Sequence, residues 1–459
     1  MNEHFTDNGS YWFASMDQVV PPEPATLPAS VDVAIIGGGF TGLWTAYYLK
    51  SKNPGLDIAV FEAQVVGFGA SGRNGGWCTG SAMGIDQMLA RPSLVPKALA
   101  IVHAMHDTVD EVGRVCQAEN IDCHFAKGGT VTVATTPFHA TVMAEEVRHK
   151  QSIGYGEGDY VWLSAEEAAS RVAVSPNYGA VFTPHCAAIH PARLVRGLAD
   201  VVRSKGVQIF EFTPVREFSP GSLTTSRGVV RAGRILRATE GYTDTLKGEG
   251  RKLLPLYSMM VATEPLPDSL WREIGLRQRE TFGDFRRLVT YGQRTLDNRI
   301  AFGGRAGYFF GSKIKPVIDP SDPVFDRVEG VLKSLLPMLS GTRITHRWGG
   351  LMGVPRHWRP HVTFDERTGL GSAGGYVGEG VAASNLAGRV LSDLVTGADT
   401  DLTRLAWVDD VPRRWEPEPL RYLGAGSIQF FGDRADRAEL ATGKPSKFWG
   451  KLFERFVLR

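Results

Sequence analysis

The chain has 459 residues, the length of about three average domains or of an interleaved two-domain enzyme. Its 51 Lys plus Arg and 49 Asp plus Glu leave a formal net charge of +2, so neither sign is in the excess that favours binding to nucleic acid or anionic membranes. The 43% hydrophobic and 22% charged residues exclude disordered, collagen-like and fibrous chains. We therefore expect a globular protein without a nucleic-acid partner.

The cysteines and the N-terminal residues indicate a compartment. Cys78, Cys116, Cys123 and Cys186 are too few and too widely spaced for a disulfide framework. The first residues lack the basic start and apolar stretch of a signal peptide, and no run of about 18 apolar residues occurs. We expect a cytoplasmic protein with reduced thiols.

The first third of the chain predicts a βαβ unit behind an N-terminal arm. Residues 1–30 end in a Pro-rich stretch that resists helix and sheet, and we expect them to lie on the body as an arm. Residues 31–36 form an apolar run typical of a buried parallel strand. Residues 43–50 have helical periodicity, and residues 58–61 predict a second strand.

The later elements follow from periodicity and helix-start signals. Ser164 and Glu167 match a capping box, and Pro191 opens a helix. The strand-rich stretch 253–310 predicts a mostly antiparallel sheet inserted between segments of the nucleotide-binding domain. Helices are predicted over 85–120, from 138, from 164 and over 191–204, and strands over 128–134, 207–212, 257–263, 287–291 and 299–303.

A glycine motif lies at the turn from the first strand into the first helix. Residues 37–42 read Gly-Gly-Gly-Phe-Thr-Gly and fit G-x-G-x-x-G, whose glycines allow a tight turn and close approach of a pyrophosphate to the backbone. The helix N-terminus adds partial positive charge. Glu62 closes the second strand 20 residues after Gly42, where a carboxylate can accept hydrogen bonds from both ribose hydroxyls. Together these residues predict a dinucleotide site.

Two further glycine-rich segments favour a flavin over a nicotinamide dinucleotide. Residues 67–76 follow soon after Glu62, and residues 374–381 lie about 300 residues later and open a helix over 382–394. A long cofactor needs contacts from such distant segments. The first would carry the ring end, and the second would place a helix N-terminus near charge that develops on a reduced ring.

These residues resemble the FAD-dependent oxidoreductases of the D-amino acid oxidase and glycine oxidase superfamily, and above all its gamma-glutamylputrescine oxidase-like branch. The similarity covers nearly the whole chain, and Ser-Gly-Arg-Asn-Gly-Gly at 71–76 is quite specific. It implies an α/β fold in which a Rossmann-like domain holds FAD non-covalently and an inserted, mostly antiparallel sheet roofs the flavin. The segments are an arm (1–30), an FAD-binding domain (31–122, 185–250 and 346–400), a substrate domain (123–184 and 251–345) and a C-terminal helical extension (401–459).

The resemblance also implies site residues. Glycines of the first motif would meet the pyrophosphate, Glu62 the ribose, residues 71–76 the isoalloxazine, Val215 the adenine and residues 378–381 the ribityl and pyrimidine end. The implied cofactor-binding residues are Gly37, Gly39, Phe40, Thr41, Gly42, Glu62, Ala70, Ser71, Gly72, Arg73, Asn74, Gly75, Gly76, Val215, Gly378, Glu379, Gly380 and Val381. On the substrate side the candidates are Arg305, Tyr308 and Trp348, and no single catalytic residue is assigned.

The implied reaction is oxidation of the C–N bond of an amine. Hydride would pass to the flavin, the imine would hydrolyse in water, and the electrons would reach oxygen and give hydrogen peroxide. A dehydrogenase that uses a quinone or carrier, an NAD-dependent dehydrogenase and a flavin domain serving RNA modification are alternatives. Amino acid oxidases of this branch have a carboxylate-binding arginine after Trp-Gly-Gly-Leu, where this chain has Met352. An α-amino acid substrate is therefore in doubt.

Other patterns favour structural roles. Residues 69–73 break the nucleophile elbow G-x-S-x-G at its last position, which disfavours a serine hydrolase. His103 and His106 have no carboxylate at metal-binding spacing, and no metal site is predicted. Cys78 lies two residues after Gly76, and we expect it to be a buried small hydrophobe rather than a covalent flavin attachment.

The C-terminal residues form a basic amphipathic pattern. Lys447, Lys451, Arg455 and Arg459 recur every fourth residue beside aromatic and aliphatic residues. Such a helix can pack on its own protein, pack on a second subunit or lie on a membrane surface. We expect packing on the protein, because a net charge of +2 provides no wider basic face.

Overall fold

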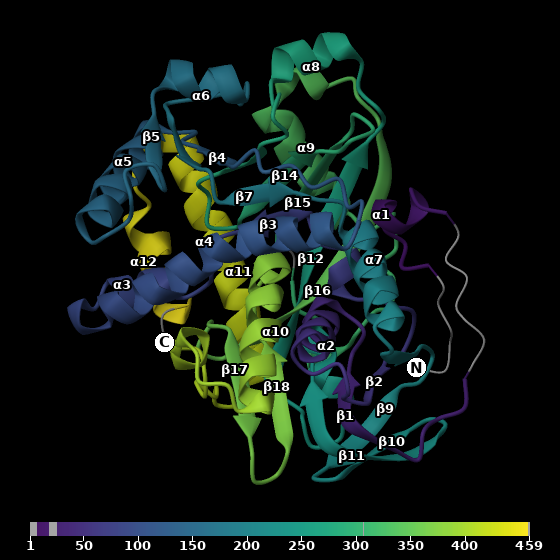
Figure 1. Cartoon of the computed structure of the whole chain (residues 1–459). Coiled ribbons are helices and arrows are strands. Elements are labelled where there is room, and N and C mark those ends of the chain that lie inside the picture. Colours follow the sequence, from purple (N-terminus) through teal and green to yellow (C-terminus); the bar gives the residue numbers. More distant parts are fainter. Residues whose placement is uncertain (1–6, 18–24, 306, 458–459) are drawn as a thin grey trace.

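The structure is a computed structural model that describes residues 7–17, 25–305 and 307–457. Its parallel sheet, mostly antiparallel sheet and C-terminal helices confirm the predicted fold class (Figure 1). The helices are α1 (Tyr11–Ala14), α2 (Phe40–Lys52), α3 (Ile85–Leu89), α4 (Val95–Ala118), α5 (Pro137–Ser152), α6 (Ala165–Arg171), α7 (Pro191–Ser204), α8 (Asp268–Ile274), α9 (Val324–Leu335), α10 (Gly380–Thr396), α11 (Leu420–Thr442) and α12 (Lys447–Val457).

The first sheet has the order β17-β18-β11-β1-β2-β8, with the antiparallel pair β9 and β10 beside β11. Neighbours from β18 to β8 are parallel. Their apolar side chains are covered on both faces, as parallel strands require, and the main core lies between this sheet and α2, α4, α7 and α10. The strands are β1 (Ser30–Ile36), β2 (Ile58–Phe61), β8 (Gln208–Phe210), β9 (Val215–Ser219), β10 (Ser222–Thr225), β11 (Gly228–Arg237), β17 (His361–Asp365) and β18 (Leu370–Gly374).

The second sheet has the order β16-β12-β15-β14-β13-β4-β6-β5. Its neighbours are antiparallel except β13 and β4. The strands are β4 (Thr130–Val133), β5 (Val161–Leu163), β6 (Ala180–Thr183), β12 (Leu253–Thr263), β13 (Thr281–Asp284), β14 (Thr290–Arg294), β15 (Ile300–Arg305) and β16 (Ile344–Pro355), and a separate pair joins β3 (Trp77–Thr79) to β7 (Cys186–Ala188).

Two boundaries in this sheet differ from the expectation. The strand predicted over 287–291 begins only at Thr290, because the backbone N–H groups of Arg287 and Leu288 donate to the Asp436 carboxylate of α11 instead of a neighbouring strand. The domain boundary expected at residue 346 falls inside β16, which pairs with β12 along its whole length. Residues 346–355 therefore belong to the second sheet.

Proline splits the helix predicted over 85–120. Arg91 is extended, with φ −117° and ψ 108°, as the residue before a proline prefers. Pro92 then starts a short 3₁₀ turn, so α3 and α4 are separate helices. The capping box predicted at Ser164 and Glu167 is confirmed at the start of α6.

The N-terminal arm packs on the body where it is described. Tyr11, Trp12 and Phe13 of α1 are buried, and they share an apolar cluster with Trp348 of β16. The Trp12 indole N–H donates to the Asn74 carbonyl at 2.8 Å, so the arm supports the 67–76 loop. The Pro-rich stretch 21–24 lies outside the described residues.

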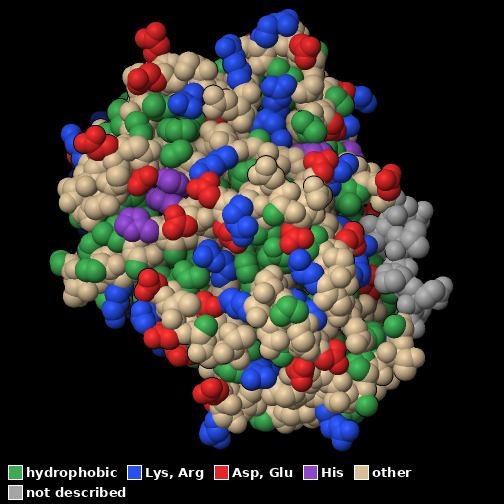
Figure 2. All heavy atoms as spheres, viewed as in Figure 1, with side chains coloured by type: hydrophobic (Ala, Val, Ile, Leu, Met, Phe, Trp, Pro, Cys, Tyr) green, Lys and Arg blue, Asp and Glu red, His purple; other side chains and the backbone are tan. Residues whose placement is uncertain are grey.

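The C-terminal helix packs on α11, as we expected for the basic tail. The Trp449 ring of α12 stacks on Phe431 of α11, with ring centroids 6.1 Å apart. Positive and negative side chains are mixed over the face seen in Figure 2, without a large area of one sign. Among residues 7–17, 25–305 and 307–457, no helix has both the length and the apolar character needed to cross a bilayer.

Candidate cofactor and substrate site

A cavity of about 1270 Å³ connects the first sheet to the second. This is above the range of about 300–1,000 Å³ typical of small-molecule pockets, as a long ligand requires. It brings together the three glycine-rich segments that the sequence singled out. The expected residues that line it are Gly37, Gly39, Phe40, Thr41, Glu62, Ala70, Ser71, Arg73, Asn74, Gly75, Val215, Gly378, Glu379, Gly380 and Val381.

Two helix N-termini border the cavity without a side-chain cap. The N-cap of α2 is Gly39, which has no side chain, and the N-cap of α10 is Glu379, whose side chain makes no capping hydrogen bond. The first backbone N–H groups of a helix need acceptors and carry partial positive charge. Among the first N–H groups of α2, the N–H of Phe40 is the one that donates to a side chain of the described residues, Ser71 Oγ at 2.9 Å. The two ends therefore suit anionic or carbonyl oxygens of a ligand.

Glu62 presents a buried carboxylate at the end of β2. Its Oε2 accepts the Gly38 N–H at 2.7 Å and its Oε1 the Gln64 N–H at 2.9 Å. Burial raises the pKa of Glu62 to about 6, although these N–H donors oppose the shift. The side chain is thus largely ionised at neutral pH and can accept hydrogen bonds from ribose hydroxyls.

The loop after β2 carries a buried cation. Arg73 is 1% exposed, and its Nη1 donates to the Gly349 carbonyl at 3.3 Å. Its Nε and Nη2 have no hydrogen-bond partner among the described residues. Because buried donors without acceptors are costly, Arg73 suits a ligand with carbonyl oxygens. The Trp348 indole donates to the Arg73 carbonyl at 2.8 Å and holds this loop against β16.

Three expected cofactor residues do not line the cavity. A Cβ at Gly42 would overlap the Gly37 carbonyl oxygen, and one at Gly72 would overlap the carbonyl of Gly67. Gly76 has φ +72°, and its Cβ would overlap the amide of Gln293. These glycines allow close packing of the loops, and their contact with the cofactor stays a prediction.

Tyr308 and Trp348, two of the substrate-side candidates, are not among the lining residues, although Tyr308 packs in one apolar cluster with Leu254 and Met352 of the wall. The Tyr308 hydroxyl donates to Glu418 just before α11, and Trp348 is in the apolar cluster with the arm. Neither residue is part of the cavity wall. Arg305 ends β15, and its side chain lies outside the described part of the chain.

Other lining residues were not assigned to the site from the sequence. Glu240 accepts N–H bonds from Gly375 at 2.8 Å and Tyr376 at 3.2 Å, and burial raises its pKa to about 7. It lies in the run Ala-Thr-Glu-Gly-Tyr at 238–242. The apolar wall includes Leu254, Leu256, Leu351, Met352, Trp358 and Ile428.

These features fit the predicted FAD. The helix ends without side-chain caps suit the phosphate oxygens of a dinucleotide, and the carboxylate of Glu62 suits ribose hydroxyls. The unpaired donors of Arg73 suit the carbonyl oxygens of the ring. Glu62, Val215 and Gly378, which we expected at the ribose, the adenine and the pyrimidine end of the cofactor, line this one cavity.

Comparison with known proteins supports the predicted flavoenzyme family and the FAD cofactor. Residues 32–394 match the family model DAO, described as FAD dependent oxidoreductase. Gamma-glutamylputrescine oxidoreductase of Escherichia coli (strain K12) is 28% identical over 407 residues, 86% of this chain and 90% of that protein. Glycine oxidase of Geobacillus kaustophilus (strain HTA426) is 24% identical over 388 residues, 80% of this chain and 94% of that protein. The crystal structure of glycine oxidase from Geobacillus kaustophilus gives a TM-score of 0.68 at 21% identity, and the match covers 84% of this chain and 100% of that one.

The match spans the glycine motif, both sheets and α10. It confirms the implied family and FAD as the cofactor, and it sets aside the NAD-dependent dehydrogenase. The chain therefore belongs to the DAO family of FAD-dependent oxidoreductases, enzymes that act on amines and amino acids.

Proposed function

We propose that the protein oxidises the C–N bond of a primary or secondary amine that is not a simple α-amino acid. Met352 carries this proposal. It lies in the cavity wall, 8% exposed, on β16, where amino acid oxidases of the resembling branch have a carboxylate-binding arginine. An oxidoreductase named for gamma-glutamylputrescine is among the relatives.

The chain's residues would hold the cofactor and exclude water. The ends of α2 and α10 would meet its oxygens, Glu62 its ribose, and Arg73 a carbonyl of its ring. When bound, FAD supplies a hydride acceptor for the carbon beside the amine nitrogen. The apolar wall around Met352 lowers the local dielectric and so favours the neutral amine, the form that reacts, over the ammonium.

Met352→Arg tests the missing carboxylate clamp. We expect the wild-type flavin to be reduced faster by simple amines, or by amines with a distant anionic group, than by glycine or D-alanine. The variant should shift this preference towards the amino acids, because arginine pairs with a carboxylate. Anaerobic stopped-flow bleaching measures both, with Met352→Leu as the volume-matched control. If glycine or D-alanine were the fastest substrate of the wild type, the proposal would be wrong.

Glu62→Ala should weaken FAD retention. Loss of the acceptor leaves ribose hydroxyls unpaired, which costs about 1–3 kcal/mol, or roughly 5- to 150-fold in Kd. Titration of apoprotein with FAD, followed by quenching of flavin fluorescence, measures the change. Glu366→Ala, at an exposed position, is the control. Equal affinities for the two variants would remove Glu62 from the site.

We also propose oxygen as the electron acceptor, because glycine oxidases are among the relatives. A peroxide assay beside an artificial-acceptor assay separates an oxidase from a dehydrogenase.

We propose non-covalent FAD, since Cys78 is buried and does not line the cavity, and release of FAD by acid precipitation tests this. The free thiols support a reducing compartment such as the cytoplasm.

A further inference from the structure

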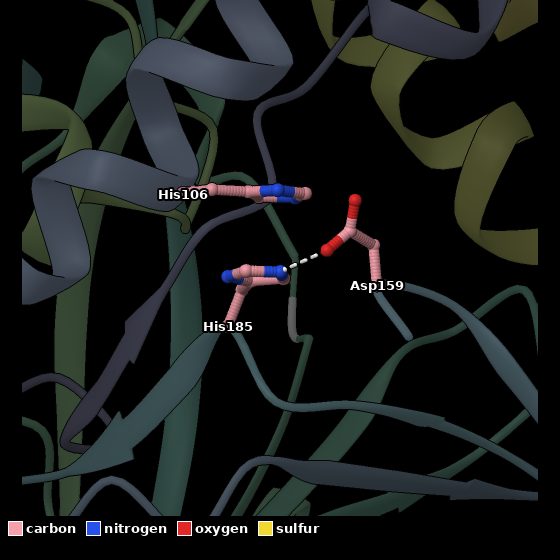
Figure 3. A group of neighbouring side chains, drawn as sticks. All are labelled: His106, Asp159 and His185. Atoms are coloured by element: carbon pink, nitrogen blue, oxygen red, sulfur yellow. Dashed lines mark hydrogen bonds and ion pairs between the residues drawn. The ribbon is translucent and has the colours of Figure 1, made fainter. Parts of the chain in front are cut away.

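Three side chains from distant segments form a cluster at the wall of the cavity. His106 comes from α4, Asp159 from the loop before β5, and His185 from the turn between β6 and β7 (Figure 3). Both histidines line the cavity. This group is separate from the glycine-rich segments and from the apolar wall around Met352.

The three side chains are close enough to share one ion. Each offers a nitrogen or oxygen atom, and these atoms all lie within 4.8 Å of one another. The imidazole edges of both histidines face the carboxylate in Figure 3. His185 Nε2 lies 2.8 Å from Asp159 Oδ1, and the other oxygen of Asp159 accepts the Gly156 N–H at 2.9 Å. The carboxylate is thus held in place by its own loop.

His185 presents Nε2 to the carboxylate, so Nε2 is the nitrogen that can bind the ion, and the ring proton then lies on Nδ1. His185 Nδ1 is buried and has no hydrogen-bond partner among the described residues. His106 is partly buried, and its imidazole also faces the carboxylate (Figure 3). Two imidazoles beside a carboxylate are a donor set that Zn²⁺ and similar ions prefer.

We propose that His106, Asp159 and His185 bind one divalent transition-metal ion of the Zn²⁺ class. Three protein ligands leave at least one coordination position for water or for an oxygen or nitrogen of a molecule in the cavity. The two rings stack with centroids 3.6 Å apart and planes at 4°. Because parallel rings direct their lone pairs into separate planes, binding turns one ring and ends the stacking.

Zinc titration of the FAD-loaded enzyme tests the site. After removal of metals with a chelator, calorimetric titration at pH 7.5 should show one Zn²⁺ bound per chain. His106→Asn, Asp159→Asn and His185→Asn should each weaken binding by about tenfold or more, since each removes a ligand. His103→Asn is the matched control, because His103 is exposed on the same helix, three residues before His106. The Zn²⁺ affinity of this variant should stay within about twofold of the wild-type value. Binding that survives all three ligand substitutions would overturn the proposal.

A second measurement on the wild type avoids any folding defect of the variants. Stoichiometric Cu²⁺ should give an electron paramagnetic resonance spectrum with hyperfine coupling to imidazole nitrogens. A spectrum of free or oxygen-ligated Cu²⁺ would refute the site. Neither measurement requires turnover, so the metal site and the proposed amine oxidation succeed or fail independently.

Discussion

Replacing Arg287 by alanine is expected to lower the free energy of unfolding by about 3 kcal/mol, the lower end of the range for breaking a buried ion pair. The Arg287 guanidinium holds Glu439 of α11, with Nη2 2.9 Å from Oε1, and lies 3.5 Å from Asp436. The Glu439 and Asp436 side chains are only 1% and 7% exposed, so both would lose their main cation while largely shielded from solvent. Urea unfolding followed by circular dichroism measures the loss.

Arg437→Ala is the control for this prediction. Arg437 lies on α11, the helix that carries Asp436 and Glu439, and pairs with Asp433. Its side chain is 72% exposed, so the change should cost no more than about 1 kcal/mol of unfolding free energy. Comparable losses in the two variants would show that Arg287 does not hold α11. Ala425 and Ile428 of α11 line the cavity, and a loosened α11 should therefore also increase the fluorescence of released flavin.

The effect of Arg287→Ala should depend on pH. Burial alone would raise the pKa of Glu439, but the neighbouring His139 imidazole, 3.6 Å away, and the hydrogen bonds from Arg287 lower it to about 2, against an ordinary 4.5. A depressed carboxyl pKa contributes stability above the unfolded value and loses it as the pH falls towards the folded value. The difference between wild type and variant should therefore shrink between about pH 4.5 and 2.

Gly42→Ala should weaken FAD binding about tenfold or more and lower the free energy of unfolding by about 1–3 kcal/mol, as overpacking does. The new methyl group would overlap the Gly37 carbonyl oxygen and lie 3.1 Å from Ile35 Cγ2. A backbone carbonyl cannot move aside alone, so α2 must shift away from β1 and displace the loop that lines the cavity. FAD titration and urea unfolding of the same sample measure both effects.

Gly330→Ala provides the matched control. Gly330 lies in α9, and a Cβ there meets no atom within 4 Å. Alanine should stabilise this helix by about 0.5–1 kcal/mol and leave FAD affinity unchanged. Wild-type affinity in Gly42→Ala would mean that close packing of α2 on β1 does not position the cofactor loop.

The sequence by itself determined the nucleotide-binding unit. The strand at 31–36, the glycine turn, the helix and Glu62 lie within about thirty residues. In that range, periodicity and backbone sterics act locally and identify the elements without knowledge of the rest. The capping box at Ser164 was predictable for the same reason, because its partners are three residues apart.

Only the tertiary structure decided which residues share a site. Gly76 fits its motif as well as Gly37 does, but Gln293 and the Ile189 carbonyl from distant segments pack against it, and it does not line the cavity. The carboxylate that a metal at His106 would need is Asp159, 53 residues away, and no helical spacing points to it. Strand β14 starts late because α11, almost 150 residues further on, takes the N–H of Arg287. Such contacts depend on how the two sheets and the C-terminal helices pack, and a local pattern carries no information about chain segments that meet only after folding.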